Sequence, residues 1–195
     1  MSKILILSAG TNDQSLNNLL AKHLSLQLNN MKIENNIFTN LYSDIPFLLE
    51  RKDETPNKIL DIRASLEVSS RMVIFSPVFN GGFLATLKNT LDWLSLSYDD
   101  LNYNDLFKDK PVAVVSSVNG SGGNAPSAFK LLEAQLMNYG LNTYPELLLF
   151  TKEDFKNFPQ LEKNEIAQKK LMDFINNFLI FGWWFHRFSQ LVHQH

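Results

Sequence analysis

The chain of 195 residues contains no cysteine, which excludes disulfide bonds, thiolate metal ligands and a cysteine nucleophile. It also lacks an excess of charge: the formal net charge is −2 and no basic run is interleaved with aromatic residues, so nothing favours a nucleic-acid partner. Long apolar runs are missing too. The most apolar late stretch, residues 178–185, is too short to span a bilayer, and no signal-peptide pattern follows Met1. We therefore expect a cytoplasmic protein with no membrane span and no metal site.

Apolar residues make up 45% of the chain and charged residues 19%, the composition of a globular protein. Short apolar runs alternate with segments of helical periodicity, and the last helix is expected at about residues 162–181. The predicted strands are Ile4–Leu7, Ile33–Phe38, Met72–Phe75, Val112–Val115 and Tyr144–Phe150. This alternation predicts an α/β fold, a doubly wound five-stranded parallel sheet in the order 2-1-3-4-5 with helices on both faces. We expect one domain over residues 1–181 and an aromatic tail over residues 182–195.

One stretch organises the rest, residues 76–92, with the sequence S-P-V-F-N-G-G-F-L-A-T-L-K-N-T-L-D. A buried apolar run leads into a turn that begins at Pro77. Residues 80–82, Asn-Gly-Gly, tolerate positive φ, and a helix with its first apolar residue at Phe83 is expected to follow. A turn between a strand and a helix leaves backbone N–H groups free to bind a ligand.

Three such turns are predicted, at residues 8–17, 77–82 and 117–123, and in the expected strand order all three meet at the carboxyl edge of the sheet. The first is rich in hydroxyl and amide side chains and precedes a helix that Ser15 can cap, which suits a phosphate. The other two contain glycines that let backbone approach a flat ring. Each turn taken alone is explained by capping or chain reversal; their joint placement indicates a ligand site.

The same residues resemble the signature of the NADPH-dependent FMN reductase family, flavodoxin-like quinone, azo-dye and chromate reductases, which reads roughly S-P-E-Y-N-x-S-x-P-x-x-L-K-N-A-I-D-W. The first turn resembles the family's G-S-x-R-x-x-S-x-N, with Ser15 and Asn17 on its second Ser and its Asn. The third resembles S-x-G-x-x-G-G, with Ser117, Gly122 and Gly123 matching. The resemblance covers about residues 3–150 and implies a flavodoxin-like fold.

The sequence departs from this pattern in several places. Asn12 stands where the family has Arg, so no fixed cation faces the phosphate, and we expect weaker FMN affinity. Val78 and Phe79 replace the Glu and Tyr of P-E-Y-N. Leu84 replaces a Pro, and Asn119 replaces the first glycine of the third turn, a mild change because Asn tolerates the left-handed conformation.

The resemblance implies FMN as cofactor, NADPH or NADH as co-substrate, and a ping-pong hydride mechanism that passes electrons to quinone-like or other electron-poor small molecules. The FMN would carry the chemistry, so no catalytic side chain is expected. A homodimer or a dimer of dimers is expected as the assembly. The expected cofactor-binding residues are Ser8, Asn12, Ser15, Leu16, Asn17, Pro77, Val78, Phe79, Asn80, Gly81, Ser117, Asn119, Gly120 and Gly122.

Other conspicuous residues have a structural interpretation. Trp93 is expected to pack or to contact a partner subunit, and Asp92 to bind a polar neighbour. His23 is expected at the surface, and the pair His193 and His195 in solvent. Phe174, Phe178, Phe181 and Phe185 recur at helical spacing, which indicates packing. The aromatic tail is expected to pack on its own domain or on a partner subunit, where it could roof the flavin pocket.

Two rival functions remain open at the level of sequence. One is an electron carrier of the flavodoxin type, which the near-neutral charge disfavours. The other is a flavodoxin-like domain that has lost its flavin and serves in interaction or regulation, a reading that the missing Arg supports.

Overall fold

The structure is a computed structural model that describes residues 3–50, 54–157 and 159–181. Its main sheet is parallel throughout, with the spatial order β2-β1-β3-β6-β7. The five strands are β1 (Ile4–Ser8), β2 (Asn35–Phe38), β3 (Arg71–Phe75), β6 (Pro111–Ser117) and β7 (Asn142–Phe150). Numbered along the chain, these strands follow the order 2-1-3-4-5, which confirms the predicted topology.

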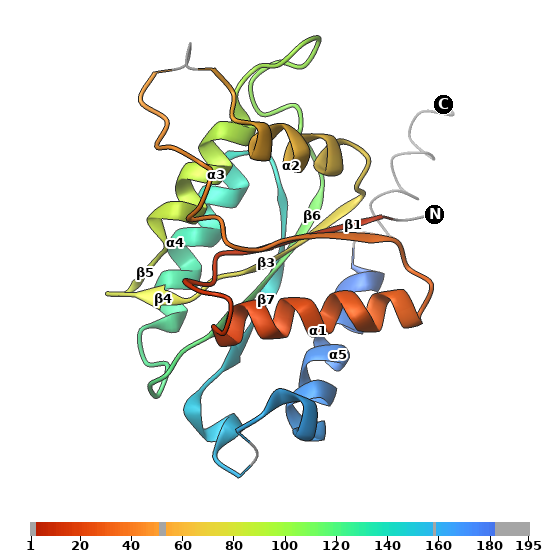
Figure 1. Ribbon diagram of the computed structural model, residues 1–195, viewed down its shortest axis with the longest axis vertical. Helices are drawn as coiled ribbons and strands as arrows, with labels where there is room; N and C mark the ends of the chain where they lie inside the picture. The colour runs from red at the N-terminus through yellow and green to blue at the C-terminus, as the bar shows by residue number, and fades with distance from the viewer. Residues whose placement is uncertain (1–2, 51–53, 158, 182–195) are drawn as a thin grey trace.

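Among the residues that the structure describes, five α-helices enclose the sheet on both faces (Figure 1). They are α1 (Leu16–Asn30), α2 (Asn57–Glu67), α3 (Ala85–Ser95), α4 (Ala125–Asn138) and α5 (Glu165–Ile180), with short 3-10 helices η1 (Lys152–Phe155) and η2 (Leu161–Lys163) before the last. Buried side chains of α2, α3 and α4 share one core with the sheet, and those of α1 and α5 share the other. In the described part of the chain, no helix combines the length and the apolar character needed to cross a membrane.

The first strand shows why a continuous apolar run forms the centre of such a sheet. Its side chains alternate between the two faces, as strand geometry requires. Ile4 and Ile6 join the core under α1 and α5, whereas Leu5 and Leu7 join the core under α2, α3 and α4. All four are fully buried, so each face must be apolar and the run has no polar interruption.

The predicted helix start at Phe83 is wrong, because a β-hairpin precedes the helix. Val78–Phe79 (β4) pairs antiparallel with Gly82–Phe83 (β5), and α3 begins only at Ala85. The two residues between the strands, Asn80 and Gly81, have φ of 48° and 77°. Positive φ at both central positions is the geometry of a type I′ turn, for which Asn-Gly is the preferred sequence.

Two further boundaries differ from the sequence prediction. The strand expected from Ile33 begins at Asn35, since Lys32 takes φ 58° and the chain is still turning away from α1. The last helix begins at Glu165 and not near residue 162, because the Asn164 side chain accepts a hydrogen bond from Ala167 N at 2.9 Å and caps the helix there.

The aromatic residues of α5 pack on the sheet as predicted. Rings of Phe174, Phe178 and Phe181 surround Tyr144 of β7 at centroid distances of 5.4, 5.7 and 5.1 Å. Arg71 donates hydrogen bonds to the carbonyl oxygens of Phe178 and Phe181, which satisfies the end of the helix. Phe185, the two terminal histidines and the aromatic tail of residues 182–195 lie outside the described residues.

Candidate FMN site at the carboxyl edge of the sheet

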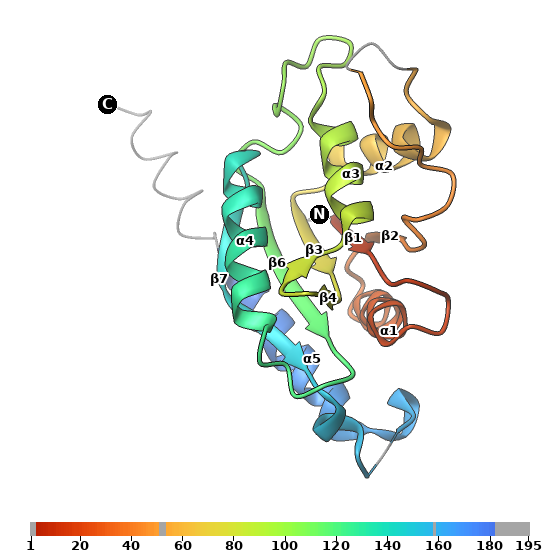
Figure 2. The same ribbon diagram turned by 90° about the vertical axis from the view of Figure 1, so that its left-hand side faces the viewer.

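Three turns follow the adjacent strands β1, β3 and β6 at one edge of the sheet. Figure 1 shows the start of α1, the β4–β5 hairpin and the turn after β6 all on the left-hand side, and Figure 2 views that side directly. Parallel strands expose their carboxyl ends together, which is where α/β sheets of this kind bind ligands.

A cavity of about 300 Å³ opens between the hairpin and the turn after β6. This volume lies at the lower end of the range typical of small-molecule sites. Its walls are backbone-rich and none of the lining residues has an ionisable side chain. They are Val78, Asn80, Gly81, Val118, Gly120, Ser121, Gly122, Gly123, Asn124 and Ala125.

Several glycines leave room for a ring to approach the backbone of this cavity. A Cβ atom added to Gly81, Gly120 or Gly123 would meet nothing within 4 Å, so open space lies beside each. Gly122 serves a different purpose. It has φ 81°, and a Cβ there would lie 2.7 Å from Leu149 Cδ2, so the turn can close against β7 only with glycine at this position.

Five of the predicted site residues line this cavity, namely Val78, Asn80, Gly81, Gly120 and Gly122. Pro77 instead lines a much smaller apolar cavity beneath the hairpin, of about 10 Å³. The Phe79 side chain does not line the cavity and is 55% exposed. Asn119 is exposed and Ser117 is buried.

Sequence reasoning missed the beginning of α4 as part of the cavity. Asn124 and Ala125 line it together with Ser121 and Val118. The signal is present in the sequence, since this turn, like the one before α1, leads from a strand into the start of a helix.

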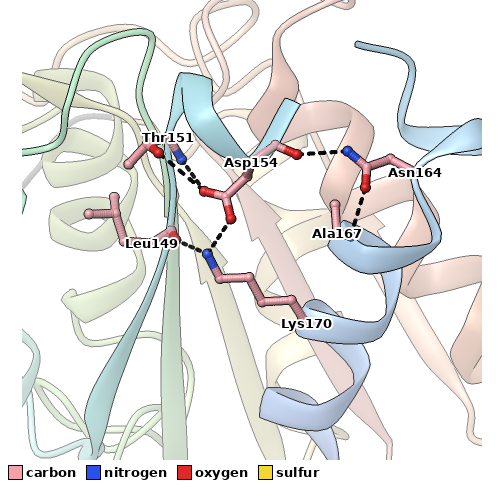
Figure 3. A network of polar contacts seen from close by, with 6 residues as sticks. All are labelled: Leu149, Thr151, Asp154, Asn164, Ala167 and Lys170. Carbon is pink, nitrogen blue, oxygen red and sulfur yellow. Dashed lines mark hydrogen bonds and ion pairs between the residues drawn. The ribbon is translucent and has the colours of Figure 1, made fainter. Parts of the chain in front are cut away.

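A polar network joins the end of β7 to α5 (Figure 3), and Leu149 and Thr151, which belong to it, are the neighbours of Gly122. Asp154 accepts hydrogen bonds from Thr151 N at 2.8 Å and from Lys170 Nζ at 2.7 Å, and Lys170 Nζ also donates to Leu149 O at 2.8 Å. Burial alone would raise the pKa of Asp154, but the hydrogen bonds from Lys170 and Thr151 outweigh it and lower that pKa overall. The network fixes the positions of Leu149 and Thr151, the two residues with which a side chain at position 122 would clash.

The turn between β1 and α1 is held in shape by its own side chains. Ser15 is the N-cap of α1, and its Oγ accepts a hydrogen bond from Asn18 N. Asn12 Oδ1 accepts from Gln14 N at 3.0 Å, and Asn12 O accepts from Asn18 Nδ2 at 2.8 Å. The first helical turn leaves the backbone N–H groups of residues 16 and 17 without intrahelical acceptors, and these are suited to an anion.

The tightness of this turn depends on Gly10, which sequence reasoning did not single out. A Cβ at this position would lie 2.1 Å from Ser15 Oγ and 2.5 Å from Asn18 Oδ1. Ser8 lies under the turn and is fully buried, and its hydroxyl has no hydrogen-bond partner among the described residues. The one charged residue among positions 8–18 is Asp13, so the turn offers neutral donors and no cation.

The first and third turns are joined by a single side chain. Asn17 is 3% exposed, and its Oδ1 accepts a hydrogen bond from Ser117 N at 3.1 Å. Its Nδ2 donates to Ser117 O at 3.2 Å. The Asn17 side chain is therefore engaged inside the protein, and the group that it leaves for a ligand is its backbone N–H.

The helix part of the organising stretch is structural, as predicted. Trp93 is 1% exposed, and its Nε1 donates to Pro46 O at 2.8 Å. Asp92 accepts from Lys88 Nζ at 2.7 Å and from the hydroxyl of Tyr139 at 2.6 Å. By contrast His23, which was expected at the surface, is half-buried, and burial lowers its pKa.

A 2-1-3-4-5 parallel sheet with a glycine-walled cavity at its switch point defines the flavodoxin-like class of α/β proteins. Within that class the chain belongs to the NADPH-dependent FMN reductase family, whose model matches residues 2–152. It is thus an oxidoreductase with FMN as cofactor and NAD(P)H as co-substrate.

Solved structures show the same fold at low sequence identity. The NAD(P)H:(acceptor) oxidoreductase FerB from Paracoccus denitrificans has a TM-score of 0.72 at 22% identity over 91% of this chain and 95% of its own. An oxidoreductase from Corynebacterium diphtheriae has a TM-score of 0.64 at 19% identity, over 88% of this chain and 91% of its own. General stress protein 14 from Treponema denticola, solved in complex with FMN, has a TM-score of 0.59 at 14% identity, over 91% of this chain and 98% of its own. A comparison with curated proteins gives no match.

The residues present fit FMN. Open space beside Gly81 and Gly120 suits a flat ring, and the free N–H groups at the start of α1 suit its phosphate. The Arg that the family places in the first turn is absent, so the donors that this turn offers to a phosphate are hydroxyl, amide and backbone groups.

Proposed function

We propose that the protein passes electrons from NAD(P)H to quinone-like or other electron-poor small molecules by a ping-pong mechanism. When bound, FMN supplies the hydride chemistry. The observation that supports this most is the cavity itself, whose lining residues carry no ionisable side chain. Such walls can bind and orient a ring and its co-substrates, but they cannot exchange protons with them.

For the cofactor we propose a divided site. The phosphate binds at the start of α1, at Ser15 and at the backbone N–H groups of Leu16 and Asn17. The ring lies between the hairpin at Val78–Gly81 and the turn at Val118–Gly123. Backbone N–H groups of the turn between β6 and α4 stabilise negative charge on the ring. Asn12 Nδ2 adds a neutral donor to the phosphate. Ser8, Pro77, Phe79 and Asn119 support the three turns from outside the cavity.

We further propose a cytoplasmic homodimer. The outer face of α4 supports a subunit contact, because Leu131 and Met137 are 57% and 61% exposed on the same helix. Light scattering of the purified protein tests this, and a monomer at micromolar concentration would contradict it.

Steady-state kinetics separates an enzyme from an electron carrier. We expect continuous oxidation of NADPH or NADH when a soluble benzoquinone is supplied with FMN, and parallel lines in double-reciprocal plots at several quinone concentrations, as a ping-pong cycle requires. A protein that binds FMN but needs an added reductase for turnover would be a carrier. A protein that binds no FMN would be the flavin-less alternative.

A further inference from the structure

The two hydrogen bonds between Asn17 and Ser117 join residues 100 positions apart in the sequence. Asn17 lies in the first turn of α1, and Ser117 is the last residue of β6. The next residue along, Val118, begins the cavity wall. One buried side chain therefore connects the helix start that suits the phosphate to the turn that suits the ring.

The sheet explains why Ser117 has backbone groups to offer. The β3–β6 ladder pairs Phe75 with Val115, and its last hydrogen bond runs from Ser76 N to Val115 O at 3.0 Å. Continued by two residues, this register would bring Pro77 opposite Ser117 and Val78 N to Ser117 O, but the chain leaves the sheet there for the hairpin, in which Val78 pairs with Phe83. The Asn17 amide bonds to both groups of Ser117 that a neighbouring strand would otherwise satisfy.

The other side of β6 is fixed independently. Ser117 pairs with Phe150 of β7, and Val118 N donates to Phe150 O at 2.9 Å. The end of β6 is thus held by β7 on one side and by Asn17 on the other. Because both amide heteroatoms of Asn17 are bonded, the position of α1 relative to the ring turn is set in distance and in orientation.

We infer that Asn17 is a positioning residue that holds the phosphate donors of α1 at a fixed separation from the ring wall, so that one FMN molecule can engage both, with its phosphate and with its ring. This inference rests on the proposed division of the site between phosphate and ring. No cation is present in the first turn, so the phosphate is held by directional hydrogen bonds, which weaken steeply when their geometry is lost. Correct spacing therefore matters more here than it would beside an arginine.

The test compares FMN with riboflavin, which has the same ring and lacks the phosphate. Flavin-free full-length protein is titrated with each, and binding is followed by quenching of flavin fluorescence. In the Asn17→Ala variant we expect FMN affinity to fall about tenfold, equivalent to about 1.4 kcal/mol, and riboflavin affinity to stay within about twofold. Asn17→Asp keeps the size of the side chain but cannot donate to Ser117 O and adds a charge near the phosphate. We therefore expect it to lower FMN affinity more than Asn17→Ala does, with riboflavin affinity unaffected.

Asn30→Ala is the matched control, because Asn30 is an exposed residue at the far end of the same helix. It should bind both flavins like the wild type. Equal losses of FMN and riboflavin in the Asn17 variants, or an unchanged ratio of the two affinities, would overturn the positioning role while the proposed function stands. A wild-type protein that binds neither flavin would instead overturn the proposed function, and this inference with it.

A measurement on the wild-type protein tests the same inference even if the Asn17 variants do not fold. Hydrogen exchange of the Ser117 amide should slow when FMN binds and change much less with riboflavin, because only the phosphate restrains α1. Equal slowing by both flavins would contradict the inference.

Discussion

The hydroxyl of Tyr139 donates a hydrogen bond to Asp92 Oδ1 at 2.6 Å, and this contact joins the end of α4 to α3 on the face of the sheet that carries the hairpin. Tyr139 is 2% exposed, and burial, together with the carboxylate of Asp92, raises its pKa above the ordinary value. A phenol that ionises less readily in the folded state stabilises the fold below about pH 10, and this contribution is lost as the pH rises above that value.

We therefore predict that the wild-type protein loses stability above about pH 10 and that Tyr139→Phe flattens this loss. At neutral pH the variant should be less stable by about 1–2 kcal/mol, because Asp92 loses a hydrogen bond. Urea denaturation at several pH values measures both effects. Tyr42→Phe, at a side chain that is 45% exposed, is the control, and an alkaline profile of Tyr139→Phe identical to that of the wild type would contradict the assignment.

The Asp154 network predicts the opposite pH dependence. The pKa of Asp154 is lowered in the folded protein, so the ionised carboxylate stabilises the fold above about pH 4, the ordinary pKa of an aspartate. This contribution is lost as the pH falls below that value. Asp154→Asn should be less stable than the wild type at pH 7, and the two should converge in acid. Asp173→Asn removes an exposed i,i+4 ion pair on α5, the helix that carries Lys170, and should change little. Parallel acid profiles of Asp154→Asn and the wild type would exclude a role for its ionisation.

Two neighbouring glycines of the third turn should respond differently to alanine. Gly122→Ala forces a Cβ against Leu149 at positive φ, so we predict a loss of about 1–3 kcal/mol in stability. Gly123→Ala meets open space at an ordinary φ and should leave stability unchanged, yet it fills part of the cavity and should weaken FMN binding. Thermal unfolding without flavin and FMN titration separate the two effects. Equal stability losses in both variants would show that the turn is not built as described.

Asn89 and Trp93 should act as a unit. Asn89 accepts from Leu48 N and donates to Pro46 O, each at 2.9 Å, and Trp93 Nε1 donates to the same Pro46 oxygen. Because they share an acceptor, we predict that the stability losses of Asn89→Ala and Trp93→Phe are not additive, with an interaction energy of about 0.5–2 kcal/mol. Urea denaturation of the two single variants and the double variant measures this energy. Strict additivity would mean that the contacts are independent.

The sheet could be predicted because its strands are encoded locally. Every residue of β1 is buried, so the continuous run of Ile4–Leu7 is sufficient to identify a central parallel strand. The aromatic spacing of α5 is likewise a local pattern, and Phe174 and Phe178 pack as it indicates.

The site could be predicted only in part from the sequence. Its key contacts join residues far apart in the chain or depend on backbone geometry. Nothing local distinguishes an asparagine that binds a phosphate from one that bonds to a strand end 100 residues away, as Asn17 does. The close approach of Gly10 to Ser15 depends on how tightly the turn closes. The hairpin is different, because Asn80-Gly81 is a local I′ signal that was recognised only as a turn.

A titration of the purified flavin-free protein with FMN, monitored by flavin absorption and by thermal unfolding, tests the central claim that three turns at one sheet edge form an FMN site. The account predicts a saturable change in the visible spectrum at one flavin per chain, and stabilisation of about 2.7 kcal/mol when free FMN is a hundredfold above Kd. An unchanged flavin spectrum together with an unmoved unfolding temperature at saturating FMN would contradict it.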